Sequence, residues 1–279
     1  MSISWNELWP GAAVLGSVLL AAACAGGPGG ATGKDAEARA EAETQQAEQE
    51  AADRSLARAL MAGVPGRTVI SRVNRDALYQ TSFLIVSKSG TVIVADPYQV
   101  LPGIEADIVI STHKDHDHND PEFYSRTKAR TSRYVLESFT VKDVSISTVA
   151  ASHYGDDFDP AVPTDVIYLL DLDDLRIAVM GDIAQTRLTD AQLSAMGAVD
   201  VAIVIMEHAP KYGYSLENTR TILSQLRPRA ALPIHPTPDV VRGAADTLGG
   251  LTEESWRWDF DAATLRTGPA RVVTLAPLP

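Results

Sequence analysis

One short stretch, residues 108–120, limits what this chain can fold into more than any other. It reads Ile-Val-Ile-Ser-Thr-His-Lys-Asp-His-Asp-His-Asn-Asp, so an apolar, β-branched run gives way to three histidines and two aspartates within six residues. Such a run is typical of a strand, and the polar residues follow where the strand would end in a loop. Imidazole nitrogens and carboxylate oxygens are ligands that zinc, manganese and iron accept. The stretch therefore predicts a loop that holds metal.

The histidines of the whole chain are concentrated around this stretch. There are six, and all of them lie between His113 and His235. Histidines scattered over a core and a surface would have no reason to cluster in this way, so the clustering favours a shared site.

Composition and charge indicate an acidic globular protein. The hydrophobic fraction is 45%, and 279 residues can bury a large core in one or two domains. The net charge is −12, and without Glu7 and residues 34–58 the remainder has 20 basic and 28 acidic residues, or −8. We expect no nucleic-acid partner, because phosphate binding needs a basic surface. The single cysteine, Cys24, excludes a disulfide framework and a thiolate metal cage.

Residues 1–24 have the pattern of a signal peptide. The apolar run 11–25 is shorter than the about 20 residues that a transmembrane helix needs. Leu20-Ala21-Ala22-Ala23-Cys24 resembles a bacterial lipobox, although the leucine is one residue early and residues 1–10 contain no Lys or Arg. We expect an exported lipoprotein of the cell envelope or periplasm, anchored to a membrane through a lipid on Cys24. An export signal without lipidation and a misassigned start codon are the alternatives.

Residues 25–66 are expected to form a linker. Gly26-Gly27-Pro28-Gly29-Gly30 is a flexible breaker, and residues 34–62 are rich in Ala, Glu, Gln and Arg. The second part is expected to be a solvated helix or a partly disordered stalk that tethers the globular domain. It could instead be an interaction helix.

Residues 67–279 form the expected catalytic domain, where short apolar runs alternate with turn residues. We predict strands at 68–73, 81–87, 91–95, 107–112, 134–136, 144–150, 166–170, 176–180, 201–206 and 230–234. Helices are predicted at 190–196, 216–226 and 239–248, starting after Thr189, Ser215 and Thr237. Two batches of strands, each followed by helices, indicate an α/β sandwich with sheets inside and helices outside.

Seven residues are candidate metal ligands. In an extended loop residues i and i+2 point the same way, so His113 and Asp115 can share one ion, while Asp117 and His118 face a second. The remaining candidates each follow a predicted strand: His153, Asp182 and His235. Four strand ends that all supply His or Asp are hard to obtain by chance.

This order of motifs resembles the metallo-β-lactamase superfamily. The loop of residues 113–118 comes first, followed by a histidine, the pair Gly181-Asp182, and a last histidine. The segment Leu226–His235, read together with Met180-Gly181-Asp182, is similar to the ascorbate-lactonase-like branch of metal-dependent hydrolases. The resemblance covers roughly residues 67–260.

The resemblance implies a four-layer αββα sandwich with a binuclear centre. Carried over by position, it assigns the first ion to His113, Asp115 and His153, the second ion to Asp117, His118 and His235, and the bridging position to Asp182. The family usually has histidine where this chain has Asp115. An aspartate is a harder, anionic ligand, so it favours manganese, magnesium or iron over zinc. Alternatively, His116 supplies the imidazole from a shifted loop, or only one ion is held.

The expected activity is that of a metal-dependent hydrolase with two divalent ions, zinc, manganese or iron. It would activate water against a small ester, lactone, amide or phosphodiester, and Asp117 would help to hold that water. His208 follows a strand on the same rim and is either a substrate contact or a plain loop histidine. Asp96 ends a strand, where it turns the chain or serves the site indirectly.

A rival hypothesis is a non-catalytic or single-metal binding module on the same fold, which Asp115 favours. A redox enzyme of the flavodiiron type would need a flavin domain, and the chain is too short to supply one.

Overall fold

The computed structural model describes residues 33–74, 82–206, 215–235 and 237–279. By its internal contacts the chain divides into two compact units, Met1–Glu48 and Gln49–Pro279, and the second contains both sheets. Helix α1 (Gly33–Met61) is present where the tether was expected to be helical, and its residues 37–52 are all exposed. Among the described residues, no helix combines the length and hydrophobicity needed to cross a bilayer.

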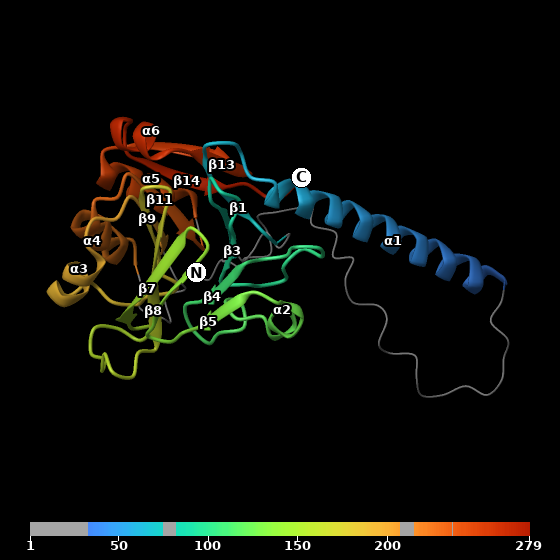
Figure 1. Ribbon diagram of the computed structural model, residues 1–279, viewed down its shortest axis with the longest axis horizontal. Coiled ribbons are helices and arrows are strands. Elements are labelled where there is room, and N and C mark those ends of the chain that lie inside the picture. Colours follow the sequence, from blue (N-terminus) through green and yellow to red (C-terminus); the bar gives the residue numbers. More distant parts are fainter. Residues whose placement is uncertain (1–32, 75–81, 207–214, 236) are drawn as a thin grey trace, which may run out of the picture. The chain divides into compact units, whose positions relative to one another are not determined.

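The first sheet has six strands in the order β13-β1-β2-β3-β4-β5 (Figure 1). Their bounds are β1 Thr68–Arg72, β2 Phe83–Val86, β3 Val92–Ala95, β4 Ile108–Ser111, β5 Arg130–Arg133 and β13 Arg257–Phe260. Strands β2 and β3 form an antiparallel hairpin, with Gly90 at a φ of 85° in its turn. Strands β3, β4 and β5 are parallel, so their carboxyl ends meet at one edge.

The second sheet has eight strands in the order β12-β14-β11-β10-β9-β8-β7-β6. Their bounds are β6 Ser138–Val141, β7 Val144–Ala151, β8 Asp165–Leu172, β9 Leu175–Val179, β10 Val201–Ile205, β11 Ala230–Ile234, β12 Leu251–Ser255 and β14 Arg271–Leu275. Strands β6 to β9 form an antiparallel meander, whereas β9, β10, β11, β14 and β12 run parallel.

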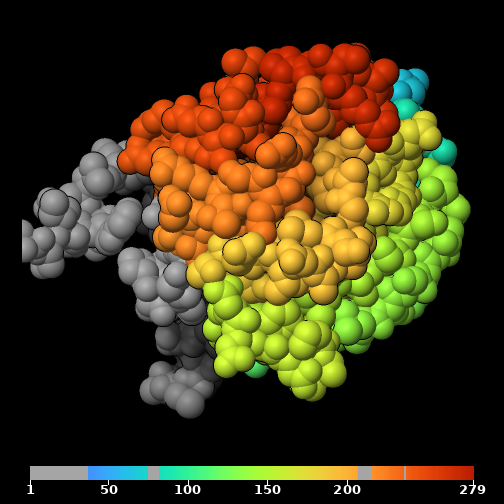
Figure 2. Space-filling model, turned by 90° about the vertical axis from the view of Figure 1, so that its left-hand side faces the viewer, coloured from blue at the N-terminus to red at the C-terminus, as the bar shows by residue number. Residues whose placement is uncertain are grey.

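Short helices cover the outer faces of the sheets. Helices α3 (Asp190–Met196), α4 (Leu216–Leu226) and α5 (Pro238–Leu248) cover the second sheet, and Figure 2 shows this face in yellow to orange. All three begin after the predicted residues, and Thr189 forms a full capping box with Gln192. Helix α2 (Pro121–Arg126) packs on the first sheet, and α6 (Ala262–Thr267) precedes β14.

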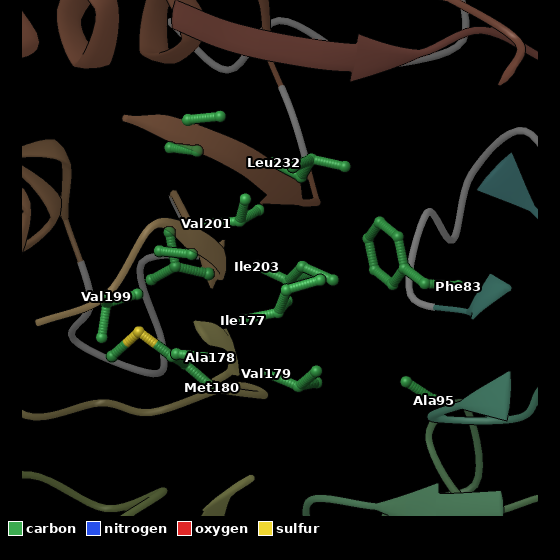
Figure 3. Close-up of a cluster of buried hydrophobic side chains, with 14 of the residues drawn as sticks. Phe83, Ala95, Ile177, Ala178, Val179, Met180, Val199, Val201, Ile203 and Leu232 are labelled. Carbon is green, nitrogen blue, oxygen red and sulfur yellow. The ribbon is translucent and has the colours of Figure 1, made fainter. Parts of the chain in front are cut away.

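The core explains why the strands form two stacked sheets. In β2, Phe83 and Ile85 belong to the core between the sheets, whereas Leu84 and Val86 face the other way, in a cluster that includes Leu60 of α1 and Phe123 of α2. Figure 3 shows Phe83 and Ala95 of the first sheet opposite Ile177 and Ile203 of the second. Strands such as β2, with apolar side chains on both faces, require cover on both faces. The predicted αββα sandwich is therefore confirmed.

The strand predicted at 134–136 is wrong. Tyr134 has a φ of +44°, and its N–H donates to the carbonyl of Ser111 (2.8 Å). The segment carries the chain from β5 in one sheet to β6 in the other, and it is a strand of neither sheet. Its three apolar side chains suggested a strand, yet they are 40–49% exposed. The predicted ranges did not include β5, β6, β12, β13, β14, α2 and α6.

Candidate metal centre

The loop after β4 is held in a turn by hydrogen bonds between its own residues. The Ser111 hydroxyl donates to the carbonyl of His118 (2.6 Å), and the N–H of His118 donates to the carbonyl of Asp115 (3.0 Å). Asp120 ends the loop by capping the first N–H groups of α2. The loop is thus tightly turned rather than extended, and four of its side chains, those of His113, Asp115, Asp117 and His118, belong to the donor groups.

The first group of donors comes from two strand ends. His113 and Asp115 in the loop lie with His153, which follows β7, so that one ligand atom of each falls within 4.8 Å of the others. The Nε2 atom of His153 is 3.6 Å from Oδ2 of Asp115, and the rings of His113 and His153 stack at 4.8 Å. His153 Nδ1 is 2.9 Å from the carbonyl of Asp182, so its N–H donates there and its lone pair lies on Nε2, the nitrogen that faces Asp115.

The second group comes from the same loop and the end of β11. Asp117, His118 and His235 again place one ligand atom each within 4.8 Å. Oδ2 of Asp117 is 4.0 Å from Nε2 of His118. His235 has a φ of +49°, a conformation that few side chains adopt, at the turn that follows β11.

Asp182, after β9, lies between the two groups. With His113 and His118 it forms a third group. This group shares His113 with the first group and His118 with the second. Its Oδ1 is 3.5 Å from Nε2 of His118, and its Oδ2 is 3.4 Å from Nε2 of His235. Gly181, at a φ of +58°, permits the sharp bend that brings this carboxylate to the centre.

Two buried, neighbouring histidines have pKa values shifted in opposite directions. His113, His118 and Asp182 are at most 3% exposed. Burial, followed by the charge of His118, lowers the pKa of His113 to about 2, so this ring is neutral. Burial alone would lower the pKa of His118 as well, but the carboxylates of Asp182 and Asp96 outweigh it and hold the pKa well above its usual value.

The donors fit divalent cations. Nε2 of His113 and Nε2 of His118 are buried and have no hydrogen-bond partner among the described residues. Bonds of about 2.0–2.1 Å to a tetrahedral ion would put its ligand atoms roughly 3.3–3.4 Å apart. The separations of 3.4 to 3.6 Å around Asp182 and His153 are close to this value. An ion held by His113 and His118 would supply a partner for each of their buried Nε2 atoms.

Comparison with known proteins agrees with this geometry. A family model described as "Beta-lactamase superfamily domain" matches residues 77–235. The chain belongs to the beta-lactamase superfamily. The similar solved structures include metallo members of this superfamily. No curated protein matches at a significant level. Neither comparison singles out the ascorbate-lactonase-like branch, which stays a prediction.

The similar structures show the fold of the superfamily. A candidate Zn-dependent hydrolase of the metallo-beta-lactamase superfamily from Thermotoga maritima has 18% identity and a TM-score of 0.55, covering 74% of this chain and 98% of that one. Igni18, a metallo hydrolase from Ignicoccus hospitalis, has 16% identity and a TM-score of 0.51, covering 76% of this chain and 96% of that one. At these identities the likeness shows the fold alone.

Two further residues of this superfamily centre lie behind the candidate ligands. Asp96, fully buried at a φ of +50°, accepts hydrogen bonds from Thr112 and has Oδ2 3.1 Å from Nδ1 of His118. Asp165 has Oδ2 3.6 Å from Nδ1 of His113. The position of Asp96 at a strand end suggested an indirect role in the site. Nothing in the sequence around Asp165 indicated a role for that residue.

The other two predicted histidines differ. His116 is 77% exposed, lies beside Tyr98, and belongs to none of the donor groups found among the described residues. Of the two alternatives at this position, the structure thus brings Asp115 and not His116 to the other donors. His208 lies outside the described residues.

Proposed function

We propose that this superfamily member is a hydrolase that uses a binuclear metal centre to activate water. Its substrate would be a small ester, lactone, amide or phosphodiester. The observation that carries the proposal is the overlap of the three donor groups, in which Asp182 stands between two sets of three ligands. A single-ion site would not need a second complete set.

Each ion would be held by donors from separate strand ends. We assign the first to His113, Asp115 and His153, the second to Asp117, His118 and His235, and the bridging position to Asp182. Zinc, manganese and iron suit these donors. When bound, two such ions lower the pKa of a water molecule and polarise the oxygen of the bond under attack.

The residues of the chain orient the reactants and move the proton. Asp117 is 14% exposed, so its carboxylate is reached by solvent, and we assign it to hold the attacking water and to accept its proton. His153 is fixed by the carbonyl of Asp182, and His118 faces Asp96, so both rings are oriented before substrate arrives. A substrate contact by His208 stays a prediction.

A second candidate function is favoured by Asp115. Its side chain is 43% exposed, whereas those of His113 and His153 are 2% and 6% exposed. An exposed carboxylate keeps its hydration and binds an ion less tightly than a buried imidazole does. This difference favours a single-metal or non-catalytic binding module, in which only the second group is filled.

Turnover by the Asp182→Ala variant tests the first proposal. The full chain is assayed against panels of lactones, esters, amides and phosphodiesters. Loss of the bridging carboxylate is expected to reduce kcat/KM by at least about 10³-fold, since both ions lose a ligand. Asp246→Ala, which removes an exposed carboxylate on α5, is the matched control and should keep full activity.

A folded Asp182→Ala protein that retains both metals and full turnover would contradict the bridging role. A wild-type protein that binds metal but turns over no member of the panels would favour the binding module instead.

A further inference from the structure

We propose that Thr112 is a positioning residue for His113, and that it joins the histidines of both donor groups to one buried carboxylate, Asp96. The inference rests on the proposed metal centre. It adds a residue that carries no ligand atom itself, contacts His113 directly and is connected to His118 through Asp96.

The hydroxyl of Thr112 lies between His113 and Asp96. Oγ1 is 3.1 Å from Nδ1 of His113 and 3.0–3.1 Å from the two carboxylate oxygens of Asp96. Asp96 also accepts the backbone N–H of Thr112 at 2.7 Å. A hydroxyl that donates to a carboxylate keeps its lone pairs for another donor, so it accepts the N–H from Nδ1 of His113. That leaves Nε2 of His113 free of a proton and facing the donor groups.

Asp96 also serves the second group. Its Oδ2 lies 3.1 Å from Nδ1 of His118, on the side of that ring away from the centre. His118 therefore faces the carboxylate directly, while His113 reaches it through Thr112. The ring centroids of His113 and His118 are 4.2 Å apart, so a shift of Asp96 or Thr112 would move ligands of both ions.

The position of Thr112 is set from several sides. Its carbonyl accepts the N–H of Val166 at 2.9 Å, which joins the end of β4 to β8 in the other sheet. Its side chain packs against Gly181, where an added Cβ would lie 2.6 Å from Cβ of Thr112. Because backbone and side chain are both held, the hydroxyl cannot leave His113 without moving the junction between the sheets.

Asp165 is the competing partner for the same nitrogen. Its Oδ2 is 3.6 Å from Nδ1 of His113, beyond hydrogen-bond range, while the hydroxyl is at 3.1 Å. Geometry thus favours Thr112.

The first test compares three variants of the full chain. Thr112→Val keeps the shape and removes the hydroxyl, and Thr112→Ser restores the hydroxyl. Thr68→Val is the matched control, because Thr68 is also buried and donates to an aspartate, Asp173, but lies at the start of β1, at the opposite end of the sheet.

Zinc and manganese are titrated into each metal-free protein by calorimetry. Thr112→Val is expected to weaken binding about 10–100-fold, as other outer-shell substitutions do, whereas Thr112→Ser and Thr68→Val should stay within roughly threefold of wild type. Equal weakening in Thr112→Val and Thr68→Val would overturn the inference, since it would reflect general destabilisation.

The second test needs no variant. Long-range ¹H–¹⁵N spectra of the metal-free wild-type protein should show His113 with its proton on Nδ1. A proton on Nε2 would overturn the inference, even if Thr112→Val failed to fold. Wild-type protein that binds no metal would instead contradict the proposed function, so the two failures are distinguishable.

Discussion

His113 and His118 are neighbours with opposite pKa shifts, and their partners explain why. His113 is buried beside a hydroxyl, and its pKa falls to about 2. His118 is buried between Asp96 and Asp182, whose charges raise its pKa well above the usual value. A metal ion needs both rings without a proton on Nε2. Only His118 must therefore lose a proton when the ion binds.

Metal binding should release this proton in a pH-dependent way. Between about pH 5 and pH 7 the raised pKa keeps His118 protonated in the metal-free protein, so binding is expected to release about one proton from it and to tighten as the pH rises. His113 should release none in this range. Calorimetric titration in buffers of different ionisation enthalpy measures the number of protons released per metal ion bound. Binding that is independent of pH over this range would show that His118 is already neutral.

At the scale of elements, the centre depends on a close approach between the ends of β4 and β9, which belong to different sheets. Gly181 follows β9, and an added Cβ there would overlap the hydroxyl of Thr112 and lie 2.6 Å from Cβ of Thr112 and 2.9 Å from Oδ2 of Asp165. Both neighbours are buried, so neither can move aside easily. The glycine is needed for its φ of +58° and for its lack of a side chain.

Replacing Gly181 by alanine, with a control at another glycine of positive φ, separates the requirement for positive φ from the requirement for no side chain. Gly181→Ala is expected to reduce the free energy of unfolding by about 2–5 kcal/mol, from strain at positive φ together with overpacking. Gly249→Ala is the control, because Gly249 has a φ of +62° and no described atom within 4 Å of the added Cβ, and should cost only about 1–2 kcal/mol. Urea unfolding measures both. Equal losses would mean that the close approach at Gly181 does not limit stability.

For the whole molecule, hydrophobic pattern and motif order predicted the sandwich because apolar runs must be buried between layers. The ligand set followed from histidines and aspartates that come directly after strands. Tyr134–Leu136 was predicted wrongly, because a crossover between sheets carries the same apolar residues as a strand. Thr112 and Asp165 could not be found from sequence, since their roles depend on contacts between segments distant in the chain. Export and anchoring through Cys24 stay predictions.

The most direct test of the account is the metal content of the purified chain, measured by elemental analysis. Two equivalents of zinc, manganese or iron per chain are expected, one for each set of donors. One equivalent would contradict the binuclear centre, and its rise to two in Asp115→His would place the deficit in the first group. A folded chain that holds no metal would contradict the account from its first observation, the histidines and aspartates after β4.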